Sequence, residues 1–180
     1  MIRDEDLKSS VDYSEGQKRA AHRVLVELVN IFEEYEDEIR VVGGWVPDLM
    51  FPKEGHVGSV EAERPDGAID VANVSVVAVV PYLIMKTAAM GRGKAKDAYD
   101  IYFIIKHYIG GVRELAKEFE PVRDKNIVIE AKDKLAGKFA SENHAGPKDV
   151  VDFMDLEDEE SIEMTRREAY DQVQALLNLI

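Results

Sequence analysis

Three carboxylates near the middle of the chain have the spacing of a metal site. Glu61 and Glu63 stand at i and i+2, so they point to the same face if residues 57–63 form a β-strand. The segment "RPDG" at 64–67 predicts a four-residue turn, because proline presets the turn and glycine accepts a positive φ. Glu61 would then lie directly opposite Asp70 on the returning strand. We expect Glu61, Glu63 and Asp70 to bind Mg²⁺ or Mn²⁺ and to be catalytic; the alternative is an exposed acidic strand edge.

A pair of glycines precedes a short predicted helix. Gly43 and Gly44 end the apolar run "IRVV", and Pro47 suits the first turn of a helix. A bare backbone at the start of a helix lets main-chain N–H groups approach the phosphate of a nucleoside triphosphate. The alternative is a packing corner between a strand and a helix, with no ligand.

Four charged side chains in the next two predicted helices and the turn between them could complete a nucleotide site: Lys86, Arg92, Asp97 and Asp100. Lys86 offers a point charge and Arg92 a planar fork to a triphosphate. Asp97 and Asp100 lie one turn apart and share a helix face. The alternative is a charge network within the helix that also involves Lys94 and Lys96.

The elements that must position these residues follow from hydrophobic periodicity and breakers. Ser14 and Gln17 form a capping box that predicts a helix over about 14–36. A short strand before Gly43 and a hairpin of residues 57–63 and 68–79 follow. Helices are predicted over about 81–90, 95–108, 112–119, 124–140 and 160–179, with "SENHAGP" as a loop. The fold class is therefore α/β or α+β, with a small sheet of three strands flanked by helices and an all-helical C-terminal part.

Two segments resemble the AbiEii-type nucleotidyltransferase family of abortive-infection and toxin–antitoxin proteins. They are "VVGGW" at 41–45 and "LIMKTAAMGRGKAKDAYDIYFI" at 83–104. The resemblance covers about 39–61 and 74–110, and it implies a minimal nucleotidyltransferase-like core over 1–110 followed by a C-terminal helical region over 111–180. It also implies transfer of a nucleotide from a nucleoside triphosphate to RNA, tRNA or protein, with Mg²⁺ or Mn²⁺ as cofactor.

The chain departs from the family pattern where the catalytic strand should lie. The family has an Asp-x-Asp pair after the glycines, and this sequence reads Glu61-Ala62-Glu63 there. The family's further strands and third carboxylate are missing, so the chain is internally shortened. Because glutamate is one methylene longer than aspartate, the metals would shift and the reacting geometry would suffer. We therefore expect an impaired or inactive enzyme; the alternatives are a non-catalytic interaction module, which partners an antitoxin or forms a homo-oligomer, and a gene remnant.

The composition limits the partners. The chain of 180 residues has 36 acidic and 23 basic residues, a formal net charge of -13 and no cysteine. This charge argues against broad electrostatic binding to nucleic acids or anionic membranes, and the lack of cysteine excludes disulfides and thiolate chemistry. The N-terminal segment has no apolar core typical of a signal peptide, so we expect a cytoplasmic protein.

Overall fold

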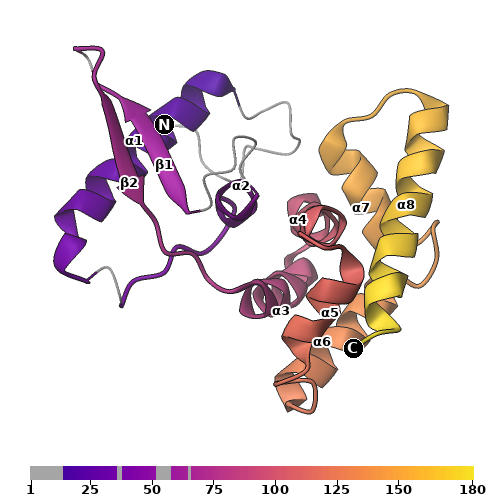
Figure 1. Ribbon diagram of the computed structural model, residues 1–180. Coiled ribbons are helices and arrows are strands. Elements are labelled where there is room, and N and C mark those ends of the chain that lie inside the picture. The colour runs from indigo at the N-terminus through magenta and orange to yellow at the C-terminus, as the bar shows by residue number, and fades with distance from the viewer. Residues whose placement is uncertain (1–13, 36–37, 52–57, 65) are drawn as a thin grey trace. The chain divides into compact units, whose positions relative to one another are not determined.

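The computed structural model describes residues 14–35, 38–51, 58–64 and 66–180 (Figure 1). These residues divide into two compact units. We call residues 14–78 the N-terminal unit and residues 79–180 the C-terminal unit, and we describe each by itself.

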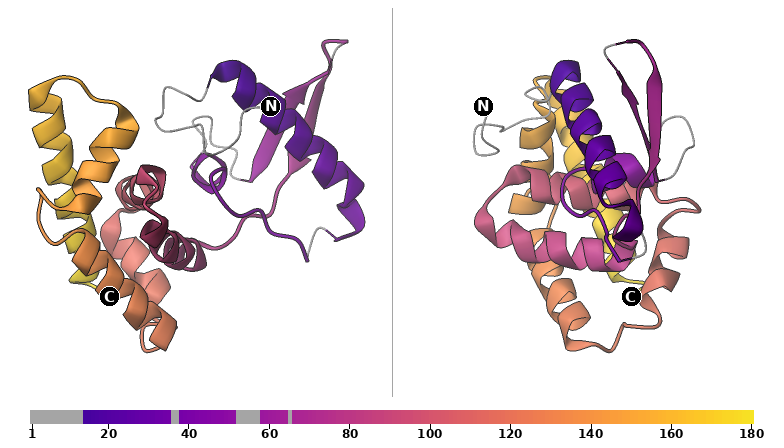
Figure 2. Two further views of the ribbon diagram at one scale, coloured as in Figure 1. Left: turned by 180° about the vertical axis from the view of Figure 1, so that it is seen from behind. Right: turned by 90° about the vertical axis from the view of Figure 1, so that its left-hand side faces the viewer.

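The N-terminal unit is a helix that covers one face of a β-hairpin. Helix α1 (Glu15–Ile31) begins with the predicted capping box between Ser14 and Gln17, and a 3₁₀ turn, η3 (Glu33–Tyr35), follows it. Strands β1 (Ser59–Glu63) and β2 (Ile69–Asn73) form the hairpin, which α1 crosses in Figures 1 and 2. The buried contact between them consists of Val26 from α1 and Val60 and Ala72 from the strands. One hairpin face is thus packed and the other is left to solvent.

The predicted hairpin is confirmed, but its predicted register is wrong by one residue. Glu61 lies opposite Val71, not opposite Asp70. A hydrogen bond from the Arg64 N–H to the Ala68 carbonyl, 2.7 Å long, closes the turn. Within the turn, Gly67 adopts a φ of 83°. This arrangement puts one more residue into the loop than a four-residue turn would, which is a common way for glycine in the left-handed region to close a hairpin. Because strand side chains alternate, a shift of one residue moves Asp70 to the other face.

The expected third strand is reduced to a single contact in the described part of the sheet. Val41 forms an isolated parallel bridge with Val76. Its N–H donates to the Ser75 carbonyl at 2.8 Å, and its carbonyl accepts from Val77 N at 3.0 Å. The short helix expected after the glycines is present as α2 (Val46–Met50), with Pro47 in its first turn.

The C-terminal unit consists of helices, as expected. They are α3 (Val79–Ala89), η4 (Met90–Arg92), α4 (Ala95–His107), α5 (Val112–Phe119), α6 (Asn126–Lys138), α7 (Ala145–Met154) and α8 (Glu159–Leu177). Helix α4 packs against α3, α7 and α8 (Figure 1). Its residues Ala98, Ile101 and Ile104 are fully buried. No described helix is both long and apolar enough to cross a bilayer.

Two details of this unit differ from the prediction. Helix α7 was not expected, because "SENHAGP" was predicted to be a loop. The helical spacing of Ile127, Ala131 and Leu135 would place Ile127 on the packed face of α6, but Ile127 is 60% exposed and Val128 is buried instead. The described part of the chain is mostly helical with one small antiparallel sheet, which is compatible with the α+β class. Helices α3 and α4 pack with the C-terminal helices; the division at residue 110 into a nucleotidyltransferase-like core and a helical region stays a prediction.

Candidate functional site

The three carboxylates of the hairpin do not form the expected cluster. Glu61 and Glu63 lie on the exposed face of β1, whereas Asp70 lies on the other face, beside Ala62. Asp70 instead forms an ion pair with Arg64, at 2.9 Å between Oδ1 and a guanidinium nitrogen. Among the residues that the structure describes, no three histidine, aspartate or glutamate side chains are grouped closely enough to hold a metal ion.

The glycine corner is built by local packing. Gly43 has a φ of 94°, which is the left-handed region that favours glycine, and a Cβ placed there would meet no atom within 4 Å. Trp45 follows at once, and its ring lies 5.0 Å from that of His22 on α1. Helix α2 is only five residues long, so it has little dipole to attract an anion. These contacts account for the corner without a ligand, and phosphate binding at Gly43 and Gly44 stays a prediction.

Lys86, Arg92, Asp97 and Asp100 do come together, between the end of α3 and the start of α4. Gly93, with a φ of 76°, ends η4 and lets the chain turn back so that α4 packs on α3. Lys86 Nζ then lies 2.9 Å from Asp97 Oδ1 and 2.6 Å from Asp100 Oδ2. The second contact is ionic and is not aligned as a hydrogen bond. The sequence order thus predicted a true spatial cluster.

The two carboxylates of this cluster are shared among three cations. Asp97 also contacts Arg92 at 3.4 Å, and Asp100 contacts Lys96 at 3.2 Å. Both aspartates are almost fully buried, whereas the Arg92 side chain is 65% exposed. The Lys86 ammonium is held mainly by the two carboxylates. The ammonium group of Lys96 lies 5.0 Å from the centre of the Phe153 ring on α7. The cluster therefore links α3, α4 and α7.

The charge state of Lys86 follows from this arrangement. Burial by itself would lower the pKa of Lys86, but Asp100 and then Asp97 outweigh burial and raise the pKa above its usual value of 10.5. Lys86 is therefore a firmly charged ammonium with two anionic partners. A triphosphate would have to displace those partners before it could contact Lys86, so the geometry favours a structural charge network. This network includes Lys96 as the alternative expected, but it joins α3 and α4 and is not confined to one helix.

A second polar network, which runs from the buried Tyr102 to the surface, was not foreseen from the sequence. Tyr102 on α4 donates a hydrogen bond to Glu168 Oε2 on α8 at 2.7 Å, and Lys106 Nζ lies 2.9 Å from both the Tyr102 hydroxyl and Glu168 Oε2. Burial raises the pKa of Tyr102 to about 12. The i,i+4 spacing of Tyr102 and Lys106 is compatible with a contact within one helix. Nothing local in the sequence pairs either residue with Glu168.

A concave site in the N-terminal unit is an apolar groove. Its volume is about 380 Å³, within the range of pockets that bind ligands. We use "the apolar groove" for the site lined by Leu25, Leu28, Val29, Asn30, Phe32, Ile39, Val41 and Val71 to Ser75. Several of these side chains are open to solvent, for example Leu28 and Phe32 at 45% each. The helical spacing of Leu25, Leu28 and Phe32 is the available sequence signal, but it predicts an amphipathic helix and not a groove.

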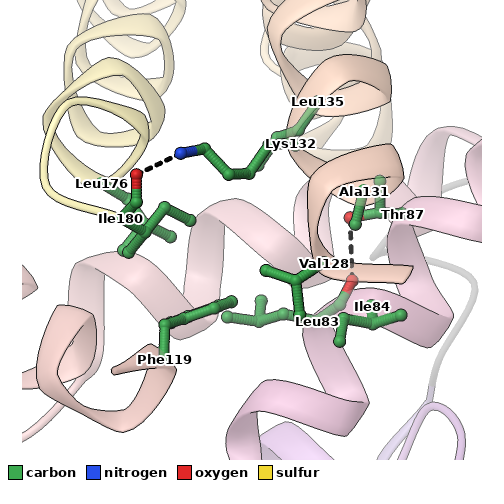
Figure 3. A pocket seen from close by; sticks show the side chains of 10 residues that line it. All are labelled: Leu83, Ile84, Thr87, Phe119, Val128, Ala131, Lys132, Leu135, Leu176 and Ile180. Atoms are coloured by element: carbon green, nitrogen blue, oxygen red, sulfur yellow. Dashed lines mark hydrogen bonds between the residues drawn. The ribbon is translucent and has the colours of Figure 1, made fainter. Parts of the chain in front are cut away.

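A small cavity in the C-terminal unit is a packing void rather than a site. It lies between α3, α5, α6 and α8 and has a volume of about 20 Å³ (Figure 3). The Thr87 hydroxyl at its wall already donates to the Leu83 carbonyl at 2.8 Å, and Lys132 Nζ donates to the Ile180 main-chain oxygen (Figure 3). The remaining lining is aliphatic or aromatic, so the cavity offers a ligand neither room nor an unsatisfied polar group.

The resemblance to AbiEii-type nucleotidyltransferases depends on the residues of this chain alone. No family model, curated protein or solved structure matches it.

Proposed function

We propose that this chain is a catalytically impaired relative of the AbiEii-type nucleotidyltransferases that acts as a non-catalytic protein-binding module. The impairment is inferred from the register of the hairpin, which puts Asp70 on the face opposite to Glu61 and Glu63. Two metal ions in a transferase need carboxylates on one face. The side chains of Glu61 and Glu63 alone supply fewer ligands than this mechanism uses.

The apolar groove supports binding as the retained role. Exposed apolar patches of this kind mark interaction sites on soluble proteins, whereas single exposed apolar residues do not. In an intact nucleotidyltransferase of this family, further strands would extend the sheet from this part of the chain. A shortened sheet would leave the surface that those strands cover available to a partner, such as an antitoxin protein or a second copy of the chain.

A transfer assay tests the impairment. The protein is incubated with each α-labelled nucleoside triphosphate, with Mg²⁺ or Mn²⁺, and with total tRNA or total RNA as acceptor. Label incorporation should equal that of a protein-free control, in protein and in RNA alike. Incorporation that is lost in both Glu61→Gln and Glu63→Gln would show that the two glutamates still catalyse transfer, and the proposal of a non-catalytic role would be wrong.

A further inference from the structure

The free edge of strand β2 runs along the apolar groove. Hydrogen bonds join Arg64 to Ala68 and Val74 to Gly58, so every second pair between β1 and β2 is hydrogen-bonded. By the same alternation, the N–H and carbonyl groups of Val71 and Asn73 point away from β1. Val41 occupies this outer edge only from Ser75 onward. The main-chain groups of Val71 and Asn73 have no hydrogen-bond partner in the described part of the chain.

This edge has the length that an added strand needs. Its unoccupied part, Ile69 to Asn73, spans about 13 Å at the usual rise of a strand. An extended segment placed there would gain main-chain hydrogen bonds from Val71 and Asn73. Every second side chain of the segment would enter the groove against Leu28 and Phe32 of α1, which are each 45% exposed. Strand addition to an open sheet edge is a recurring way of recognising peptides.

The charge beside the groove selects the kind of segment. The sequence between the lining residues Phe32 and Ile39 reads "EEYEDE", and Glu34 and Glu38 of this run are exposed. Residues 13–78 as a whole carry 13 acidic and 6 basic side chains. A basic segment would therefore be attracted to this end of the groove, and an acidic one repelled.

We propose that the apolar groove and the free edge of β2 bind an extended segment of a partner protein, with alternating branched apolar residues and flanking lysines or arginines. This inference rests on the proposed binding function and names the partner's chemistry. A second copy of this chain fits the groove less well, because its net charge of -13 would be repelled by the acidic run.

A labelled synthetic peptide tests the proposal in the full chain. Its core alternates valine and threonine, and two lysines flank each end. Three comparison peptides accompany it: one with glutamates in place of the lysines, one with the same composition in scrambled order, and one N-methylated at every second residue. Fluorescence anisotropy should show that the lysine-flanked peptide binds at least about tenfold more tightly than each of the other three. Because N-methylation removes the donors of one peptide edge and adds bulk there while leaving the side chains unchanged, that peptide reports on strand addition itself.

Two variants of α1 locate the site. Leu28→Lys puts a cation among the groove's lining residues and should weaken binding of the lysine-flanked peptide by at least about tenfold. Val24→Lys lies one turn earlier on the same helix, is 54% exposed and does not line the groove. It should change binding by less than about twofold. Circular dichroism checks that both variants remain folded; if Leu28→Lys does not fold, the peptide comparison on the parent chain decides alone.

Several results would overturn the proposal. They are equal binding of the lysine-flanked and glutamate-flanked peptides, equal binding of the N-methylated peptide, or no loss of binding in folded Leu28→Lys. A dimer in sedimentation that Leu28→Lys dissociates and Val24→Lys does not would assign the groove to a second copy, contrary to the proposal. Failure of the broader function would instead appear as nucleotide transfer in the separate assay, whatever the peptides do.

Discussion

Replacement of Lys86 by methionine tests whether the charge cluster between α3 and α4 holds the C-terminal unit together. Methionine keeps much of the side-chain volume and removes the ammonium that lies 2.9 Å from Asp97 and 2.6 Å from Asp100. Removal of one partner from a buried ion pair costs about 3–5 kcal/mol, because a charge is left buried without compensation. Asp100 retains Lys96, which is 26% exposed. We therefore expect a cost near the lower limit, about 3 kcal/mol.

The assay is urea and thermal unfolding followed by circular dichroism. A loss of about 3 kcal/mol corresponds to a fall in Tm of about 6–12 °C for a chain of this size. Arg92→Met is the matched control, since its side chain is 65% exposed and its contact with Asp97 is 3.4 Å long. Exposed ion pairs are worth about 0–1 kcal/mol, so this variant should be nearly neutral.

A double-mutant cycle separates the pair from general damage. Asp100→Asn should cost the parent protein about 2 kcal/mol. In the Lys86→Met background the same substitution should cost less than about 0.5 kcal/mol, because the carboxylate has already lost its main partner. A coupling of about 1.5 kcal/mol or more is thus expected, and additivity within about 0.5 kcal/mol would refute the reasoning. A neutral Lys86→Met would also refute it and would return Lys86 to the role of a ligand contact.

The pH dependence has a definite sign. The pKa of Lys86 is raised in the folded protein above the usual 10.5, chiefly by Asp100 and Asp97 acting against burial. The stability that Lys86 contributes is therefore fully present below pH 10.5 and is lost as the pH rises through the folded pKa. The stability difference between parent and Lys86→Met should be constant near neutral pH and shrink only in this alkaline range.

Two further predictions concern the C-terminal helices. Tyr102 should ionise with a pKa of about 12 in absorbance titrations, with Tyr102→Phe as the comparison. Glu168→Gln should lower this pKa and Lys106→Met should raise it. Shifts of the pKa in the same direction in both variants would contradict the network. Gly146→Ala should destabilise the protein by about 1–3 kcal/mol, because its Cβ would lie 2.7 Å from the Phe139 ring and 2.8 Å from the Lys138 carbonyl. Gly137→Ala has open space within a helix and should stabilise by up to about 1 kcal/mol; equal effects at both sites would be inconsistent with this packing.

The sequence predicted the helices well because their signals are local. The capping box at Ser14 and the breakers and apolar spacing that predict helices over about 81–90 and 95–108 each act within a few residues, and the structure confirms these elements. The cluster of Lys86 with Asp97 and Asp100 was predictable for the same reason, since a short turn brings two neighbouring helices together. What the sequence left open was the interpretation of that cluster, which depends on burial.

The sequence-based predictions were wrong where the structure depends on a contact between separate elements or on a shift of a single residue. One additional residue in the hairpin loop moved Asp70 to the other face, and no pattern in the strands opposed this shift. Helix α7 begins with Ala145, Gly146 and Pro147, which locally indicate a loop. Gly146 is needed there because the Phe139 ring leaves no room for a side chain. That contact between two separate helices is invisible in a single sequence.

The distribution of exposed apolar side chains separates the roles of the two units. In the described part of the chain, nine large apolar side chains of the N-terminal unit are exposed: Val24, Leu28, Ile31, Phe32, Tyr35, Ile39, Val42, Ile69 and Val71. The longer C-terminal unit has six. Leu28, Phe32, Ile39 and Val71 line one continuous groove, and this distinguishes them from the scattered apolar residues found on any protein surface. The C-terminal unit buries its helices around α4 and supplies stability, so a substitution in the groove should alter binding without loss of the helical fold.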